Sequence, residues 1–343
     1  MAIGGRRRDG GSGLARTVNL KKVVLFIALT YVISFGGFYI YKFLGGTWGD
    51  SFLFGVGYMY VPLLAALLVQ KLIYRAPVVG PLGISFRVNR WFIIAAVLPV
   101  IIIILAIGAS LLVPNTTFST APDVISERLT QYYPEEEAAM LEAQYEMMPI
   151  HPFWIALAAG LLGGVTINAV AAFGEELGWR GLLFRELMPL GFWKSSLIIG
   201  GVWGFWHFPV VLQGHNYPQN PIPGVFLMVV FTILMAPVIG YVTLRARSVI
   251  AASVFHGVIN GIGALPLFVV GGGTDLTVGL TGVGGFVALL LVNFFIWQKG
   301  EVRRFEGPWM EAISIDAEED ALADSRGDEG SIVPNEGPFR MRP

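Results

Sequence analysis

Apolar runs long enough to cross a membrane recur along the chain, and they restrict its fold more than any other feature. A transmembrane helix needs about 20 mainly apolar residues, and only helices and closed barrels satisfy their backbone hydrogen bonds inside a bilayer. Only 14% of the residues are charged, against about 25% in soluble domains. We expect an all-α, polytopic membrane helix bundle with about eight transmembrane helices. The candidate spans are residues 22–44, 51–73, 91–113, 153–186, 195–213, 223–244, 249–270 and 277–298.

Two features refine these expected helices. The fourth run is too long for one straight span, and its C-terminal part carries Arg180, Arg185 and Glu186. We therefore expect that part to protrude from the core or to bend along the interface. Pairs of glycines spaced four apart predict close helix packing, because small residues let membrane helices approach. These pairs are Gly160/Gly164, Gly200/Gly204 and Gly257/Gly261.

Basic residues are concentrated in alternate connections, and this bias predicts the orientation of the bundle. They precede the first span, occupy every second connection and follow the last span. The connections on the other side hold almost none. Because cytoplasmic loops carry the excess of Lys and Arg, we expect an integral protein of the cell membrane with both termini cytoplasmic. The biased residues are Arg6, Arg7, Arg8, Lys21, Lys22, Lys71, Arg75, Arg87, Arg90, Arg185, Lys194, Arg245, Arg247, Lys299, Arg303 and Arg304.

Three parts of the chain differ in composition. Residues 1–20 form a basic N-terminal segment, expected to be cytoplasmic. Residues 21–300 form the transmembrane domain, with a motif core at 153–270 and an acidic outer segment at 114–150. That segment is expected to include a short amphipathic helix, either a solvated loop helix or a lid. Residues 301–343, rich in Asp, Glu, Gly, Pro and Ser, have the composition of a disordered cytoplasmic tail.

Charge and cysteine content exclude several classes of function. The net charge is −1, and neither a basic helix nor a zinc-knuckle pattern is found, which argues against a nucleic-acid partner. The chain has no cysteine. This excludes disulfides, thiolate metal sites, a cysteine nucleophile, and prenylation or palmitoylation of the chain itself.

Polar residues spaced four apart mark three of the apolar runs. Positions four apart share one face of a helix. A charged group inside a bilayer is costly, so it is a functional-site candidate whose partner must be found. We expect the three pairs to converge inside the bundle. They are Glu176 with Arg180, Trp203 with His207, and His256 with Asn260.

A chemical role follows for each polar group. Glu176 is best placed to pair with Arg180, because either charge alone would be costly to bury. Glu175 lies about 100° around the helix and is free to face another neighbour. With His207 beside it, Glu175 can take a proton from water and return it to a leaving amine. The remaining pair, His256 and Asn260, offers hydrogen-bond donors that suit a developing oxyanion.

Other interpretations of these residues stay open. The Glu176–Arg180 pair fits a structural ion pair, and His207 fits a polar group capping a pocket under the tryptophans. The third pair also fits hydrogen-bonding between helices. The two remaining histidines, His151 and His215, lie in outer connections and are expected to be solvated.

Zinc is the alternative to metal-free catalysis. Two histidines and a glutamate can hold a catalytic Zn²⁺ with one open position, and the ligands would be Glu175, His207 and His256. Against this, the chain has no H-E-x-x-H pair, and the expected ligands come from three separate helices. We favour catalysis by glutamate and histidine and expect no cofactor.

The three motifs together resemble those of a known family. E-E-x-x-x-R at 175–180, an aromatic-x-x-x-H at 203–207 and H-x-x-x-N at 256–260 occur in this order on successive apolar runs. This is similar to the CPBP family of intramembrane endopeptidases, of the CAAX prenyl protease 2 and bacteriocin-processing type. The resemblance covers residues 153–270. One departure is Trp203, where the family's second motif often has phenylalanine.

The resemblance implies an eight-helix bundle that hydrolyses peptide bonds in a cavity open to cytosol and lipid. Glu175 and His207 would activate the water, and His256 and Asn260 would stabilise the oxyanion. Glu176 and Arg180 would support them. The expected partners are the lipid bilayer and a membrane-associated peptide or protein substrate, with or without a prenyl group.

Two functions of other classes compete with this one. A non-enzymatic bacteriocin-immunity or scaffold protein would use the same fold to bind a partner. Ion-coupled transport also uses intramembrane acids and interrupted helices. Transport is disfavoured because the polar residues cluster in one part of the chain and no inverted pair of interrupted helices is found.

Overall fold

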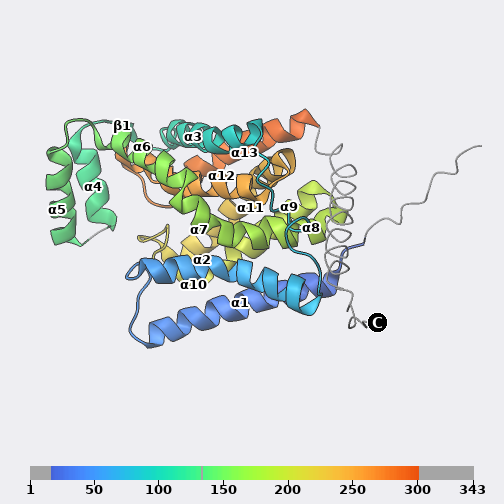
Figure 1. Ribbon diagram of the computed structural model, residues 1–343. Helices are drawn as coiled ribbons and strands as arrows, with labels where there is room; N and C mark the ends of the chain where they lie inside the picture. Colours follow the sequence, from blue (N-terminus) through green and yellow to red (C-terminus); the bar gives the residue numbers. More distant parts are fainter. Residues whose placement is uncertain (1–16, 133, 301–343) are drawn as a thin grey trace, which may run out of the picture.

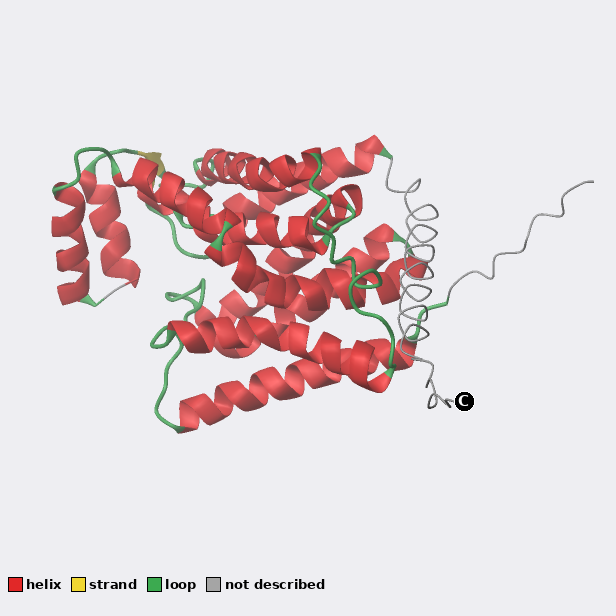
Figure 2. Ribbon diagram, viewed as in Figure 1, coloured by secondary structure: helices red, strands yellow, loops and turns green. Residues whose placement is uncertain are grey.

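Helices run back and forth between two ends of the molecule (Figure 1), and loops and two short strands join them (Figure 2). The computed structural model describes residues 17–132 and 134–300. In this part of the chain the all-α prediction is confirmed. Residues 1–16 of the basic segment and the whole tail 301–343 lie outside the described residues.

The elements follow the apolar runs closely. The longer helices are α1 (Leu20–Phe43), α2 (Phe52–Leu67), α3 (Arg90–Ser110), α6 (Pro152–Val165), α7 (Ile167–Glu176), α9 (Phe192–Trp206), α11 (Pro221–Ala246), α12 (Val249–Ile262) and α13 (Val283–Lys299). Shorter helices are η1 (Leu68–Ile73), α4 (Pro122–Tyr132), α5 (Glu135–Glu146), η2 (Leu177–Leu183), α8 (Phe184–Leu187), η3 (Met188–Leu190), α10 (Phe208–Val211) and η4 (Leu265–Phe268). Strands β1 (Thr117–Phe118) and β2 (Val270–Gly271) pair antiparallel.

Five helical segments of the described chain are long and apolar enough to cross a membrane, or six if a bent pair counts as one. The five are α1, α2 with η1, α3, α11, and α12 with η4. The expected count of eight is not confirmed, because α9 ends at Trp206 and α13 has only 17 residues. The first three of these segments bury only about a third of their residues, whereas the α12 segment buries 67%. The core therefore sits around α12.

The fourth apolar run is bent, but not where its charges predicted. The helix breaks at Thr166, and the segments on either side meet at 52°. The prediction that the charged part would protrude or bend along the interface is wrong, because Arg180, Arg185 and Glu186 are all buried inside the protein. Burial is tolerated where the charges are paired. Lys22 Nζ lies 2.8 Å from Glu186 Oε1, which ties α1 to α8.

The acidic outer segment forms a hairpin of two helices, α4 and α5, rather than one short helix. Ile125, Leu129 and Ala138 form its small apolar core, against which Phe268 of η4 packs. The buried Arg128 donates from Nη2 to the carbonyl oxygen of Val270 at 3.0 Å. The hairpin is thus attached to the segment that follows α12.

Glycines let the motif-bearing helices approach closely, as their spacing predicted. A Cβ built at Gly164 of α6 would lie 2.6 Å from Val258 Cα of α12. A Cβ at Gly200 of α9 would lie 2.5 Å from Ile233 Cα of α11. Real Cβ atoms do not approach backbone this closely, so only glycine fits at these two crossings.

We expect Gly164→Ala to lower the free energy of unfolding by about 1–3 kcal/mol, the usual range for overpacking. The neighbouring Gly163 provides the control, because a Cβ there has nothing within 4 Å. Gly163→Ala should be neutral or stabilising by up to about 1 kcal/mol, since alanine favours a helix over glycine. Thermal unfolding in detergent measures both. Equal effects of the two substitutions would contradict the close crossing of α6 and α12.

Candidate active site

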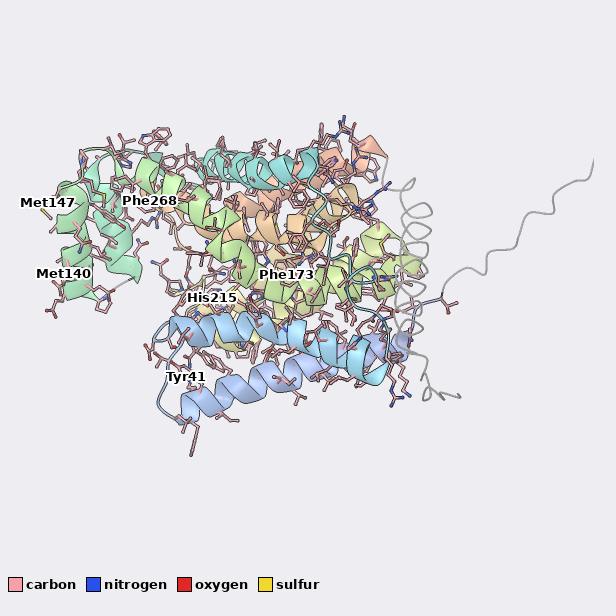
Figure 3. The ribbon with its side chains drawn as sticks, in the orientation of Figure 1. Tyr41, Met140, Met147, Phe173, His215 and Phe268 are labelled. Carbon is pink, nitrogen blue, oxygen red and sulfur yellow. The ribbon has the colours of Figure 1, made fainter. Side chains whose placement is uncertain are left out.

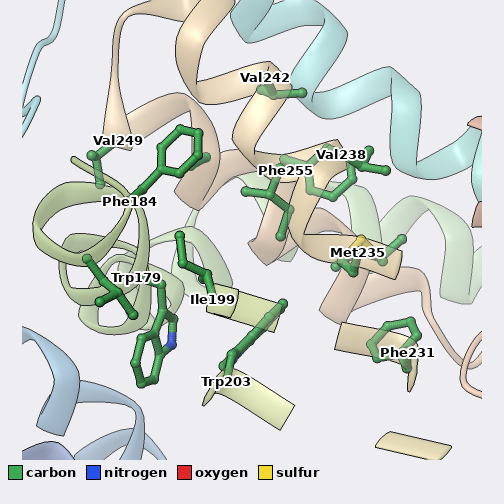
Figure 4. Close-up of a cluster of buried hydrophobic side chains, with 14 of the residues drawn as sticks. Trp179, Phe184, Ile199, Trp203, Phe231, Met235, Val238, Val242, Val249 and Phe255 are labelled. Carbon is green, nitrogen blue, oxygen red and sulfur yellow. The ribbon is translucent and has the colours of Figure 1, made fainter. Parts of the chain in front are cut away.

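A cavity of about 1020 Å³ lies between α2, α7, α9, α11 and α12, next to the hairpin. Glu175, His207, His256 and Asn260 all line it, and Trp203 lies in its wall as well. Glu176 and Arg180 do not line the cavity but contact His256 and Trp203, so the three polar pairs converge as expected. Figure 4 shows the apolar side chains packed beside this site, with Trp203 and Phe231 among them.

Glu175 lies in the last turn of α7 and is 3% exposed. Its Oε2 accepts a hydrogen bond from Trp203 Nε1 at 2.7 Å. Two glycines flank the acidic pair and let this part of the chain lie against α2. A Cβ at Gly174 would lie 2.7 Å from the carbonyl oxygen of Met59, and a Cβ at Gly178 2.6 Å from Pro62 Cβ. The π-helical turn η2 follows directly, and such turns are frequent at functional sites.

Glu176 is fully buried and is bound from two sides. Its Oε1 accepts from Arg180 Nη1 at 2.9 Å, as its spacing predicted, and lies 2.7 Å from His256 Nδ1. An ionised carboxylate only accepts hydrogen bonds, so Nδ1 of His256 carries the hydrogen. This leaves Nε2 of His256 for the cavity. Nε2 donates to an oxyanion only when the imidazole is protonated.

His207 stands where α9 ends. Pro209 has no N–H to continue the helical ladder, and α10 starts after His207. The Nδ1 atom of His207 lies 2.8 Å from the carbonyl oxygen of Trp203, so Nδ1 carries the hydrogen and Nε2 keeps a lone pair. The rings of Trp203 and His207 are not stacked, because their centroids are 5.8 Å apart and their planes are tilted by 59°.

Trp203 does more than supply an apolar aromatic ring. Its N–H bonds Glu175 Oε2, and the guanidinium carbon of Arg180 lies 4.6 Å from its ring centroid. Phenylalanine at this position would keep a ring but lose the donor. The sequence alone did not show that tryptophan and phenylalanine differ in this way at position 203, because the bonded partner, Glu175, is 28 positions away.

For the peptide cleavage that the family resemblance implies, we expect Trp203→Phe to lower kcat/KM by about 10- to 100-fold, because a hydrogen bond to a charged group contributes about 1.5–3 kcal/mol. Trp91 is the matched control. It too packs against an arginine, Arg245 at 4.8 Å, but lies outside the cavity. Trp91→Phe should leave kcat/KM within about twofold, as expected of a substitution away from the reacting groups. Similar losses in both variants would contradict a role of the Trp203 N–H.

Asn260 lies one turn beyond His256 on α12, and its exposed side chain lines the cavity. The two residues share one helical face, as their spacing predicted. They differ in burial, since His256 is only 4% exposed. Asn260 therefore meets whatever occupies the cavity, while His256 connects the cavity to Glu176.

His215 was missed by the sequence analysis. The prediction that it is solvated is wrong, because it is half-buried and lines the cavity. Its ring is parallel to that of His207, with centroids 6.3 Å apart, and Figure 3 labels it close to the start of α2. Its Nδ1 accepts from Trp48 Nε1 at 3.0 Å. No local pattern indicated this contact, since Trp48 is 167 positions away.

Burial lowers the pKa of His215 to about 4, so this imidazole is neutral at pH 7. With Nδ1 acting as the acceptor, its hydrogen is on Nε2.

The second histidine expected to be solvated, His151, is also half-buried, and its Nδ1 accepts from the backbone N–H of Phe153 at 3.2 Å. It caps α6 and does not line the main cavity.

The zinc alternative was assigned to Glu175, His207 and His256. Within the described residues, no group of three His, Cys, Asp or Glu side chains is arranged to hold a metal ion. Both histidines do have their Nδ1 atoms bound to an acceptor and Nε2 left over, as metal-bound histidines have. The three candidate ligands therefore have suitable chemistry but not a shared coordination point.

The part of the chain that contains the candidate site is similar to known proteins. Residues 151–262 match the family described as type II CAAX prenyl endopeptidase Rce1-like. The chain is also similar to CAAX prenyl protease 2 of Methanococcus maripaludis, with 33% identity over 97 residues. That match covers 26% of this chain and 36% of the relative, so it spans about a third of the relative's length.

These matches confirm the resemblance to the CPBP family of intramembrane endopeptidases that the three motifs indicated. The matched residues contain every member of the candidate site except Trp48 of the His215 contact. The apolar helices and the match to a membrane protease family support an integral membrane protein.

Proposed function

We propose that this protein is an intramembrane endopeptidase that hydrolyses a peptide bond of a membrane-associated protein or peptide. The observation that carries the proposal is the cavity lined together by Glu175, His207, His256 and Asn260. A buried carboxylate that lines the same cavity as an imidazole with a free lone pair is suited to general-base catalysis. The matched family and relative, both described as CAAX prenyl proteases, support the same reaction class.

In the proposed reaction, Glu175 and the lone pair on His207 Nε2 hold a water molecule. Glu175 takes one proton from this water while the water oxygen bonds to the scissile carbonyl carbon. The π electrons of the carbonyl group move onto the carbonyl oxygen. The resulting tetrahedral oxyanion accepts a hydrogen bond from the Asn260 amide. When the intermediate collapses, the C–N bond breaks and the proton held by Glu175 passes to the amine nitrogen.

His256 contributes the second hydrogen bond to the oxyanion when it is an imidazolium. Glu176 on the opposite ring nitrogen stabilises that charge, at 2.7 Å. Arg180 also pairs with Glu176, so the positive charges of His256 and Arg180 together balance the two buried carboxylates, Glu175 and Glu176. The role of Glu176 and Arg180 in this proposal is to orient His256 and to keep the site close to neutral, because unpaired buried charges are costly.

The test is cleavage of a panel of internally quenched peptides, some prenylated and some not, by purified protein in detergent. Each peptide is measured with and without a chelator. We expect cleavage that persists with chelator, since no cofactor enters the proposed reaction. Activity lost with chelator and restored by zinc would replace the metal-free mechanism by a metal-dependent one. Absence of cleavage across the whole panel would contradict the endopeptidase proposal for these substrates.

We expect His215→Ala to lower kcat/KM by about 5-fold, because the Nε2–H of neutral His215 is a donor in the cavity wall and one hydrogen bond contributes about 1 kcal/mol. His215→Gln, which keeps a side-chain N–H donor, should recover part of the loss. His151→Ala is the control and should lose cap stability but not kcat/KM, because it lies outside the cavity. Equal losses in both variants would contradict a role of His215 in the site.

A further inference from the structure

The two ends of the bundle carry very different charge. One end holds the start of α1, the connection before α3, the α11–α12 connection and the end of α13 (Figure 1). Two contacts join the connection before α3 to the α11–α12 connection: Val249 N–H donates to the carbonyl oxygen of Gly83 at 2.9 Å, and Asn89 Nδ2 donates to that of Ala246 at 2.9 Å. This basic end carries Lys21, Lys22, Lys71, Arg75, Arg87, Arg90, Arg185, Lys194, Arg245, Arg247 and Lys299.

The cavity lies at the other end. The connections that line it are 48–51, 213–218 and 275–281, together with parts of the α4–α5 hairpin. Hydrogen bonds tie these segments to each other, since Trp48 N–H donates to Gln213 Oε1 at 2.9 Å and Gln219 N–H donates to Asp275 Oδ2 at 2.8 Å. None of the connections at the basic end lines the cavity.

Basic residues are nearly absent from the cavity end. Among the described residues, only Lys42 and Arg128 lie there, and Arg128 is buried against β2. Carboxylates are frequent instead. They include Asp50, Glu127, Glu135, Glu136, Glu137, Glu142, Glu146 and Asp275.

The Lys and Arg bias of short connections sets the orientation of a polytopic protein, with the basic side cytoplasmic. The family resemblance implied a cavity open to the cytosol. In this fold, a cavity open to the cytosol is incompatible with a cytoplasmic basic end. The reason is that α1 starts and α13 ends at the basic end, whereas the cavity lies at the opposite end. We propose that the basic end is cytoplasmic and that the cavity opens to the non-cytoplasmic face.

The orientation has a consequence for the class of substrate, and that consequence rests on the proposed function. A cavity reached from the non-cytoplasmic face accepts polypeptide that has been translocated, such as the outer segment of a membrane-anchored protein or a peptide that remains in the membrane after export. A prenylated C-terminus on the cytoplasmic face does not reach it. The hairpin contributes Ile125, Leu129 and Tyr145 to the lining, so the substrate enters beside it.

Cysteine labelling tests the orientation without any assay of activity. The natural chain has no cysteine, so single substitutions give an unambiguous signal. Met147→Cys places a thiol on the hairpin, and Val88→Cys places one at the basic end; the native side chains are 78% and 77% exposed. Met59→Cys places a thiol in the cavity wall.

In intact cells, a membrane-impermeant maleimide should label Met147→Cys and a small charged thiosulfonate should label Met59→Cys. Val88→Cys should be labelled only after permeabilisation. The reverse pattern would overturn the inference, whether or not the protein cuts peptides.

Sealed vesicles test the consequence for the substrate. Water-soluble quenched peptides of the panel are added to right-side-out and to inverted membrane vesicles, with Glu175→Gln as the blank. We expect cleavage by right-side-out vesicles, and by inverted ones only after detergent opens them. Cleavage by sealed inverted vesicles would overturn the inference while supporting the proposed function. No cleavage even in detergent would contradict the proposed function, and the labelling would still decide the orientation.

Discussion

Replacing Glu175 by glutamine should lower kcat for peptide cleavage by about 10²–10⁴-fold, the usual contribution of a general base. The substitution keeps the size of the side chain and an oxygen that accepts the 2.7 Å hydrogen bond from Trp203. The fold is therefore expected to survive, and only the proton transfer is lost. Initial rates on the peptide panel, together with thermal unfolding in detergent, measure the two effects separately.

Glu186→Gln is the matched control for loss of a buried carboxylate. Glu186 is 4% exposed and pairs with Lys22, but it does not line the cavity. This variant should lose stability and keep the kcat of wild type. If Glu175→Gln retained the rate of wild type, water activation by Glu175 would be wrong. A biological phenotype that survived in the Glu175→Gln variant would favour the bacteriocin-immunity or scaffold alternative.

Replacing Arg180 by methionine should lower the free energy of unfolding by about 3–5 kcal/mol, the cost of leaving one partner of a buried ion pair uncompensated. Arg180 is 1% exposed, and its Nη1 lies 2.9 Å from the fully buried Glu176. Loss of the guanidinium leaves two adjacent carboxylates, Glu175 and Glu176, and His256 is then the partner of Glu176 that can still carry a positive charge. Thermal or denaturant unfolding in detergent measures the change.

A second substitution separates charge from packing. Glu176→Gln in the Arg180→Met background removes the stranded carboxylate and should restore more than half of the lost stability, because the unpaired charge causes most of the penalty. Arg245→Met is the control, since Arg245 also packs on a tryptophan but is only half-buried. Its cost should be about 1 kcal/mol or less. If the double variant were no more stable than Arg180→Met, lost packing rather than the stranded charge would explain the effect.

The orientation also decides how the family name applies to this chain. The matched relative is named for prenylated CAAX substrates, and the cavity of this protein lies at the end with few basic residues. If labelling shows that end outside the cytoplasm, the proposed chemistry acts on a class of substrate other than prenylated CAAX proteins. The catalytic residues and the side of the membrane are separate properties, because the first depends on the site and the second on the charge of the connections.

Local sequence determined the features that depend on composition and spacing. Helices α1, α2 with η1, and α3 agree with the first three apolar runs within a few residues, because the length of an apolar run fixes what can span a bilayer. The Glu176–Arg180 pair followed from a spacing of four on one helix. Glycine pairs marked two of the close helix crossings, since only small residues permit them.

Only the tertiary structure decided which helix faces meet. Local spacing places a residue on a face of its own helix, but the packing of distant helices selects its neighbour. The charged part of the fourth run was expected to protrude, yet partners on other helices let it be buried. His256 reaches Glu176 across 80 positions, and Trp48 fixes His215 across 167. The contact between Trp203 and Glu175, and the end of the bundle at which the cavity lies, were decided in the same way.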